Sequence, residues 1–129
     1  MKRDMDLVRE ILKDLSEANG PLDASAFVTD ARGRELVGYH FRIMSEAGLI
    51  VATIMSGDND PYYVCRAVRL TWEGEDFLAA VASDTVWGKV KKAVAKAVGD
   101  ASLETFKAVA VDFARKAILQ GRGCASTAP

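Results

Sequence analysis

The sequence predicts an α+β fold that is mostly helical, and three patterns support this prediction. Apolar residues from position 4 to 18 recur at helical spacing, which is typical of an amphipathic helix. Two runs rich in β-branched and aromatic residues, 50–55 and 62–70, flank the turn-forming segment 56–61, as in a β-hairpin. Helical patterns precede and follow this hairpin. The order of helix, short strand, helix, hairpin and helix therefore predicts a winged-helix-like domain in which the hairpin is the wing.

The first predicted helix has a single apolar face, made by Met5, Val8, Ile11, Leu12 and Leu15. Asn19-Gly20-Pro21 ends it, because Gly favours a left-handed cap and Pro cannot continue the hydrogen-bond ladder. The next segment, 23–27, has the length for one or two helical turns, as in an ordinary helix-turn-helix. However, Phe27-Val28-Thr29 prefers a strand. We expect a short strand there that joins the wing.

Three further helices are indicated by caps and apolar spacing. The first begins near Asp30, runs to Glu46 and buries Leu36, Val37, Phe41, Met44 and Ala47, with Gly48 after its end. Thr71 is a suitable N-cap for a second helix, at 72–81. Residues 83–85 offer caps for a third, which runs to position 98 and ends at Gly99.

A final helix is expected after Ser102, with an apolar seam formed by Leu103, Phe106, Ala110, Phe113 and Ala117. Together with the preceding helix it predicts a C-terminal helical hairpin. We expect a winged-helix-like domain at 1–83, the helical hairpin at 84–119, and a disordered tail at 120–129. The hairpin is predicted to pack on the first domain or on a second subunit.

Charge is divided unevenly along the chain. The net charge is -1, but residues 1–83 carry 9 Lys or Arg against 14 Asp or Glu, and residues 84–129 carry 8 against 4. Opposite charges on the two halves favour docking of the halves on each other or pairing of two copies. We therefore also expect a homodimer.

Composition argues against metal and nucleophilic chemistry. Cys65 and Cys124 share no ligand spacing, and His40 is the single histidine. No cofactor or metal is expected. No apolar run approaches the ~18 residues that a membrane span needs, and no signal peptide is visible, so a cytoplasmic location is predicted.

Four segments together carry a family resemblance: residues 1–7, Tyr39-His40, Ala47-Gly48-Leu49-Ile50, and Leu70-Thr71-Trp72-Glu73-Gly74 followed by Asp84-Thr85 and Trp87. In combination they resemble a bacterial and phage-associated family catalogued as domain of unknown function 2513. The resemblance spans about residues 1–119. It implies a small winged-helix-like protein, often on mobile elements, and it implies no established activity.

The helix at 30–46 provides the first set of candidate contact residues, Arg32, Arg34, Tyr39 and Arg42. Their side chains are of types that reach DNA phosphates or base edges. Against this interpretation, Asp30, Glu35 and Glu46 offset the three arginines, and the wing tip adds Asp58 and Asp60. Because phosphate neutralisation supplies most non-specific affinity, this charge balance disfavours DNA.

Lys89, Lys92 and Lys96 form a basic stripe that is either a solvated helix face or a contact for an acidic partner, for the acidic half of the chain, or for nucleic acid. Tyr62 is a further candidate, because adjacent aromatics at Tyr62 and Tyr63 on a wing suit a protein interface if one faces solvent.

Two residue types have simpler interpretations. His40 lies beside the buried stripe of its helix and is expected to be a hydrogen-bonded core group. Trp72 and Trp87 lie in first helical turns, where a large ring usually fills the edge of a core.

Leu103, Phe106 and Phe113 are expected in a core or a dimer seam.

These observations favour a non-enzymatic winged-helix module that binds another protein, as an adaptor or as a phage- or prophage-encoded inhibitor of a host factor. The alternative is a DNA-binding transcriptional regulator that acts as a dimer.

Overall fold

The computed structural model describes residues 3–98, 108–109 and 112. Its contacts divide the chain into two compact units, here called the N-terminal unit, Met1–Leu78, and the C-terminal unit, Ala79–Pro129. The described residues form an α+β structure, mostly helical, with a three-stranded antiparallel sheet. Helix α3 (Trp72–Val81) begins in the N-terminal unit, and α4 (Asp84–Val98) lies in the C-terminal unit. The predicted bounds of α3 are confirmed.

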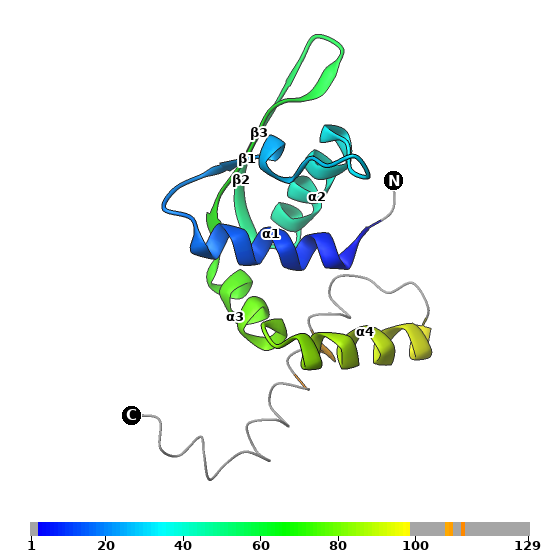
Figure 1. Ribbon diagram of the computed structural model, residues 1–129. Coiled ribbons are helices and arrows are strands. Elements are labelled where there is room, and N and C mark those ends of the chain that lie inside the picture. The colour runs from blue at the N-terminus through cyan, green and yellow to red at the C-terminus, as the bar shows by residue number, and fades with distance from the viewer. Residues whose placement is uncertain (1–2, 99–107, 110–111, 113–129) are drawn as a thin grey trace. The chain divides into compact units, whose positions relative to one another are not determined.

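The sheet of the N-terminal unit is built on its long central strand. The strand order is β1-β3-β2, where β1 is Leu22–Asp23, β2 is Ile50–Gly57 and β3 is Asp60–Leu70. The β2–β3 hairpin turns at Asn59, which has a positive φ of 61°. Its end extends beyond the helices of this unit (Figure 1). The predicted hairpin is therefore confirmed, and β2 is an edge strand.

The connection between α1 (Met5–Glu17) and α2 (Arg34–Glu46) differs from the expectation. The predicted strand at 27–29 is wrong: the strand that joins the hairpin is Leu22–Asp23, followed by the 3-10 helix η1 (Ala24–Phe27). Phe27 is buried and packs edge-on against Phe41 at 5.8 Å between ring centroids. Burial of this ring outweighs the strand preference of its segment.

Helix α2 also starts later than expected, at Arg34 rather than near Asp30. Thr29 and Arg32 exchange backbone hydrogen bonds of 3.0 and 3.1 Å, which close a small loop before the helix. Gly33 is the N-cap residue and supplies no side-chain hydrogen bond. The local loop therefore takes the backbone groups that a cap at Asp30 would have needed.

The core of the N-terminal unit is formed by the apolar faces of α1, η1 and α2 together with the inner face of the sheet. Its largest fully buried side chains include Leu7, Ile11, Leu12, Phe27, Phe41, Met44, Leu49 and Phe77. The amphipathic pattern of α1 predicted this face, and the N-cap, Asp4, accepts hydrogen bonds from the backbone of Asp6 and Leu7.

The end of α2 and the start of α3 are joined through backbone atoms. Gly48 has φ of 78°, a left-handed conformation that ends α2. Thr71 caps α3 by accepting from the N–H of Gly74 at 3.0 Å, while its hydroxyl donates to the carbonyl of Gly48. The N–H of Thr71 donates to the Leu49 carbonyl at 3.0 Å. A Cβ on Gly74 would collide with that same carbonyl oxygen, so only glycine fits.

His40 is fully buried and makes the two hydrogen bonds that its ring allows. Its Nδ1 donates to the carbonyl of Leu36 and its Nε2 accepts from the N–H of Asp4, both at 2.8 Å. These partners require the neutral ring. Burial lowers the pKa of His40 from its usual value. The expectation of a hydrogen-bonded core group is confirmed.

In the C-terminal unit, α4 buries Trp87, Val90 and Val94 on one face. The Nζ of Lys91 lies 5.7 Å from the centroid of the Trp87 ring. The expected burial of Trp87 is confirmed. The second helix of the predicted hairpin lies almost wholly outside the described residues, as does the tail.

We predict that Gly74→Ala lowers the free energy of unfolding by about 3 kcal/mol or more, because the added methyl group meets a fixed backbone oxygen. Gly88→Ala is the matched control: it also lies within a helix, and a Cβ there meets no atom within 4 Å. It should stabilise by up to about 1 kcal/mol. Urea unfolding measures both, and equal effects of the two substitutions would contradict this account.

We predict that stability falls as pH is lowered through the range of the single histidine. A histidine whose folded pKa is lowered stabilises the fold above its unfolded pKa of about 6.5, and this contribution is lost as pH falls below that value. Urea unfolding between about pH 7.5 and 5.5 should show the decline, and His40→Phe should reduce its slope. An unchanged slope in His40→Phe would assign the decline to other groups.

Candidate functional site

Two of the candidate arginines are engaged within the protein. Arg32 pairs with both carboxylate oxygens of Glu10 in α1, at 3.1 and 3.2 Å. Arg34, in the first turn of α2, donates to the backbone carbonyls of Tyr62 and Tyr63, the latter at 3.1 Å. Its guanidinium Nη1 also lies 3.6 Å from the carboxylate Oδ2 of Asp60. These guanidinium groups hold the loop and the hairpin against helices of the same unit.

Tyr62 packs against α2 instead of facing solvent. It is 8% exposed, and the nearest carbon of its ring lies 2.6 Å from where a Cβ of Gly38 would be. Arg42 places its guanidinium 5.6 Å from the centre of the same ring. Arg34, Gly38 and Arg42 follow one another at four-residue steps, so a single face of α2 grips the start of β3. The structure thus brings together three predicted contact residues, Arg34, Arg42 and Tyr62, and both arginines contact Tyr62 within the protein.

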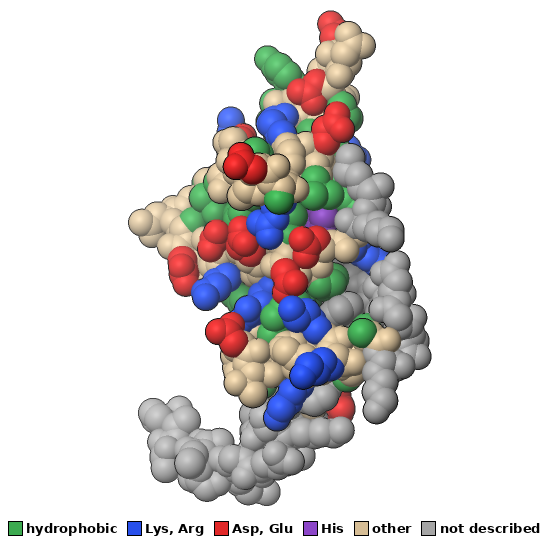
Figure 2. Space-filling view, turned by 45° about the vertical axis from the view of Figure 1, so that its right-hand side comes forward, with side chains coloured by type: hydrophobic (Ala, Val, Ile, Leu, Met, Phe, Trp, Pro, Cys, Tyr) green, Lys and Arg blue, Asp and Glu red, His purple; other side chains and the backbone are tan. Residues whose placement is uncertain are grey.

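What α2 leaves exposed is acidic in balance. Glu35, Arg42 and Glu46 are exposed, and Tyr39 is half-buried with its ring edge-on to His40. The hairpin turn adds exposed Asp58, and Figure 2 shows acidic side chains near the end of the hairpin. Tyr63 is 67% exposed and Met55 58% exposed on the same hairpin. Of the two adjacent tyrosines, Tyr63 is the one that faces solvent.

The remaining predicted residues lie in the C-terminal unit. Lys89 and Lys92 are exposed on α4, and Lys96 lies further along the same helix. Leu103, Phe106 and Phe113 lie outside the described residues. The dimer seam that they were expected to form stays a prediction.

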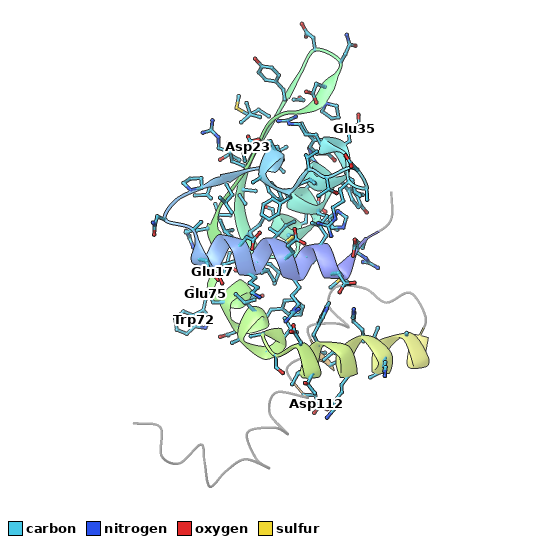
Figure 3. The ribbon with its side chains drawn as sticks, viewed as in Figure 1. Glu17, Asp23, Glu35, Trp72, Glu75 and Asp112 are labelled. Atoms are coloured by element: carbon cyan, nitrogen blue, oxygen red, sulfur yellow. The ribbon has the colours of Figure 1, made fainter. Side chains whose placement is uncertain are left out.

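Sequence reasoning missed the most exposed large apolar side chain in the described part of the chain, Trp72. It was expected at a core edge, but it is 81% exposed at the start of α3, from which it projects outward (Figure 3). Its neighbours indicate the direction of its side chain, because Thr71 caps the helix and Gly74 faces the Leu49 backbone. Helical geometry then directs the side chain of Trp72 away from Leu49.

Trp72 lines a cavity of about 550 Å³ that lies wholly within the N-terminal unit. Its walls come from the end of α1, the loop after it, the end of β3 and the start of α3. The lining residues are Leu15, Ser16, Ala18, Asn19, Gly20, Val68, Arg69, Leu70, Thr71, Trp72 and Glu75. An open cavity beside an exposed indole is typical of a recognition surface.

The free cysteine that the structure describes is not activated as a nucleophile. Cys65 is fully buried, and this burial raises the pKa of its thiol to about 11. Such a thiol is a poor nucleophile at neutral pH.

In the described ranges, no three His, Cys, Asp or Glu side chains gather as a metal site. Among the helices that the structure describes, none has the length and apolar character to cross a bilayer.

Comparisons with known proteins give a family but no activity. A family model described as "Hypothetical protein (DUF2513)" matches residues 2–100. An "Uncharacterized protein" of Haemophilus influenzae is 39% identical over 113 residues, which cover 85% of this chain and 92% of that protein. No solved structure matches the chain.

We predict that Arg34→Met lowers the free energy of unfolding by about 1–3 kcal/mol, because two carbonyls of β3 lose a charged donor. Arg66→Met, at an exposed position of the same strand, is the control and should change it by less than about 0.5 kcal/mol. Urea unfolding of both variants is the measurement. A silent Arg34→Met would show that the guanidinium is available to a ligand.

Proposed function

The chain belongs to the DUF2513 family, whose description assigns no activity, and we propose that it is a non-enzymatic winged-helix module that binds another protein. The strand order β1-β3-β2, with η1 and α2 between β1 and β2, supports the winged-helix assignment. In this assignment α2 is the recognition helix and the β2–β3 hairpin is the wing. The two roles that fit are an adaptor and a phage- or prophage-encoded inhibitor of a host factor.

One observation carries the proposal: two of the three arginines expected at a DNA-binding face are already paired within the protein. Arg32 binds Glu10, and Arg34 binds the hairpin backbone. The exposed residues left on the recognition helix and wing tip include Glu35, Glu46 and Asp58. A surface of this balance gains little from releasing counterions from DNA, so its partner is better sought among proteins.

Exposed apolar side chains support the same conclusion. Met55 and Tyr63 on the wing and Trp72 on α3 are all more than half exposed. Aromatic residues and methionine are enriched in protein interfaces, and tryptophan and tyrosine are frequent among the few residues that supply most of the binding free energy.

The alternative is a DNA-binding regulator that acts as a dimer. The observation in its favour is that Arg42 on α2 and Lys89 and Lys92 on α4 are exposed. If a second copy placed its lysines beside Arg42, the combined surface would gain positive charge.

We predict that duplex DNA binds no more tightly than the ~10⁻⁴–10⁻⁶ M typical of non-specific complexes at physiological salt. Fluorescence anisotropy with labelled duplexes of random sequence and of the protein's own upstream DNA measures this. A nanomolar, sequence-selective complex whose affinity falls steeply with salt would establish the alternative instead.

A photo-crosslinking amino acid at position 63 provides the positive test. In the native host it should yield a discrete protein adduct that is absent when the probe is at Thr85, an exposed position of the C-terminal unit. The captured protein, once purified, should bind the unmodified chain, and Tyr63→Ala and Trp72→Ala together should weaken that binding. If no captured protein binds the purified chain, the proposed function is wrong.

A further inference from the structure

Trp72 differs from its neighbours, each of which has a structural role. Leu70 is buried, Thr71 caps α3, and Gly74 permits close packing on Leu49. The indole between them is 81% exposed. Exposing so large an apolar ring forgoes about 1.5–3 kcal/mol that burial would provide. A surface ring beside a cavity is therefore available to a ligand.

At the same place β3 extends past its pairing with β1. Among the described residues this pairing joins Leu22 to Ala67 and Asp23 to Arg66. Residues Val68–Leu70 of β3 continue beyond this pairing and line the cavity with Trp72. An extended peptide can add to such an edge and place alternate side chains in the adjoining hollow.

The charge around this cavity is negative. The first turn of α3 carries two acidic residues, Glu73 and Glu75, and no basic residue, and Glu75 lines the cavity. Glu17, in the last turn of α1, lies between the lining residues Ser16 and Ala18 in sequence, and Figure 3 labels it together with Trp72 and Glu75.

Basic side chains around the cavity are fewer than acidic ones. Arg69 is the basic residue among those lining the cavity, and its guanidinium donates to the carbonyl of Leu70 at 3.1 Å. On α1, Lys13 is offset by Asp14 and Glu17. Neither Glu17 nor Glu75 forms an ion pair in the part of the chain that the structure describes.

We propose that Trp72 and this cavity are the docking site for an extended basic segment of the partner protein. A Lys or Arg side chain of that segment lies over the Trp72 indole and pairs with Glu75. An apolar neighbour enters the cavity. The attraction of a cation to an indole face and to a carboxylate makes this site selective for basic over acidic peptides. The inference depends on the proposed function, because it names the class of partner.

The test uses the 129-residue chain and two short synthetic peptides. One peptide alternates Arg or Lys with Val or Leu, and the other has Glu at the charged positions. The chain has two tryptophans, so its indole N–H groups give two signals in a ¹⁵N-labelled spectrum, assigned with Trp72→Phe. The basic peptide should shift the Trp72 signal and bind about fivefold or more tightly than the acidic one. Trp72→Ala should abolish the preference.

Glu75→Lys should weaken basic-peptide binding about fivefold or more and reduce its salt dependence. Glu35→Lys is the matched control, with the same charge change on α2 away from the cavity, and should leave binding nearly unchanged. Equal weakening by both variants, a Trp72 signal that does not move, or equal binding of the two peptides would overturn the inference. Trp72-dependent self-association without peptide would assign the site to a second copy and would also overturn it.

The two proposals fail separately. If the purified partner captured through position 63 binds normally to Trp72→Ala and Glu75→Lys, the docking site is wrong while the protein-binding function stands.

Discussion

The contact of Thr71 and Gly74 with the backbone of Gly48 and Leu49 is the constraint on which the rest of the N-terminal unit depends. At this point the end of α2, the start of β2, the end of β3 and the start of α3 meet within a few residues. The contact uses backbone carbonyls, one hydroxyl and a missing side chain. Gly48 and Leu49 lie in the tight connection between α2 and β2, and their N–H groups donate to the carbonyls of Ser45 and Met44 at 3.0 and 2.9 Å, so little adjustment is available there. The spacing of Ala-Gly-Leu-Ile and Leu-Thr-Trp-Glu-Gly follows from this geometry.

The same contact determines what the surface presents. With Thr71 and Gly74 turned toward Leu49, Trp72 and Glu75 lie one turn apart on another side of α3, where both line the cavity. A structural requirement at two positions thus fixes the direction of two others. The motif therefore combines a part that holds the fold together with a part that faces a ligand.

Much of the fold was predictable because its signals are local. The turn-forming residues at 56–61, the Thr71 cap and the apolar face of α1 each act within a few residues, and the corresponding elements lie where expected. The two-residue strand β1 was not predictable, because pairing with β3 defines it and its composition does not. The direction of Trp72 was missed for a similar reason: α3 has apolar residues on several sides, so periodicity alone does not identify the buried one.

The residues of the candidate site were predictable from the sequence, but the contacts that those residues make within the protein were not. Arg34 and Arg42 both contact Tyr62, yet the sequence contains no sign of either contact. Whether an arginine is occupied depends on which backbone carbonyls the fold places near it, and carbonyls are present at every position. Charge counting therefore gave the correct sign for this surface without identifying which cations remain exposed.

The grip of α2 on Tyr62 has a mechanical consequence. Arg34, Gly38 and Arg42 join the helix and the hairpin at three successive steps, so the two elements present their outer side chains as one stiff body. A ligand that touches both meets a surface whose shape already exists before the encounter. Less conformational freedom is then lost on association, and this preorganisation allows a small contact area to give useful affinity.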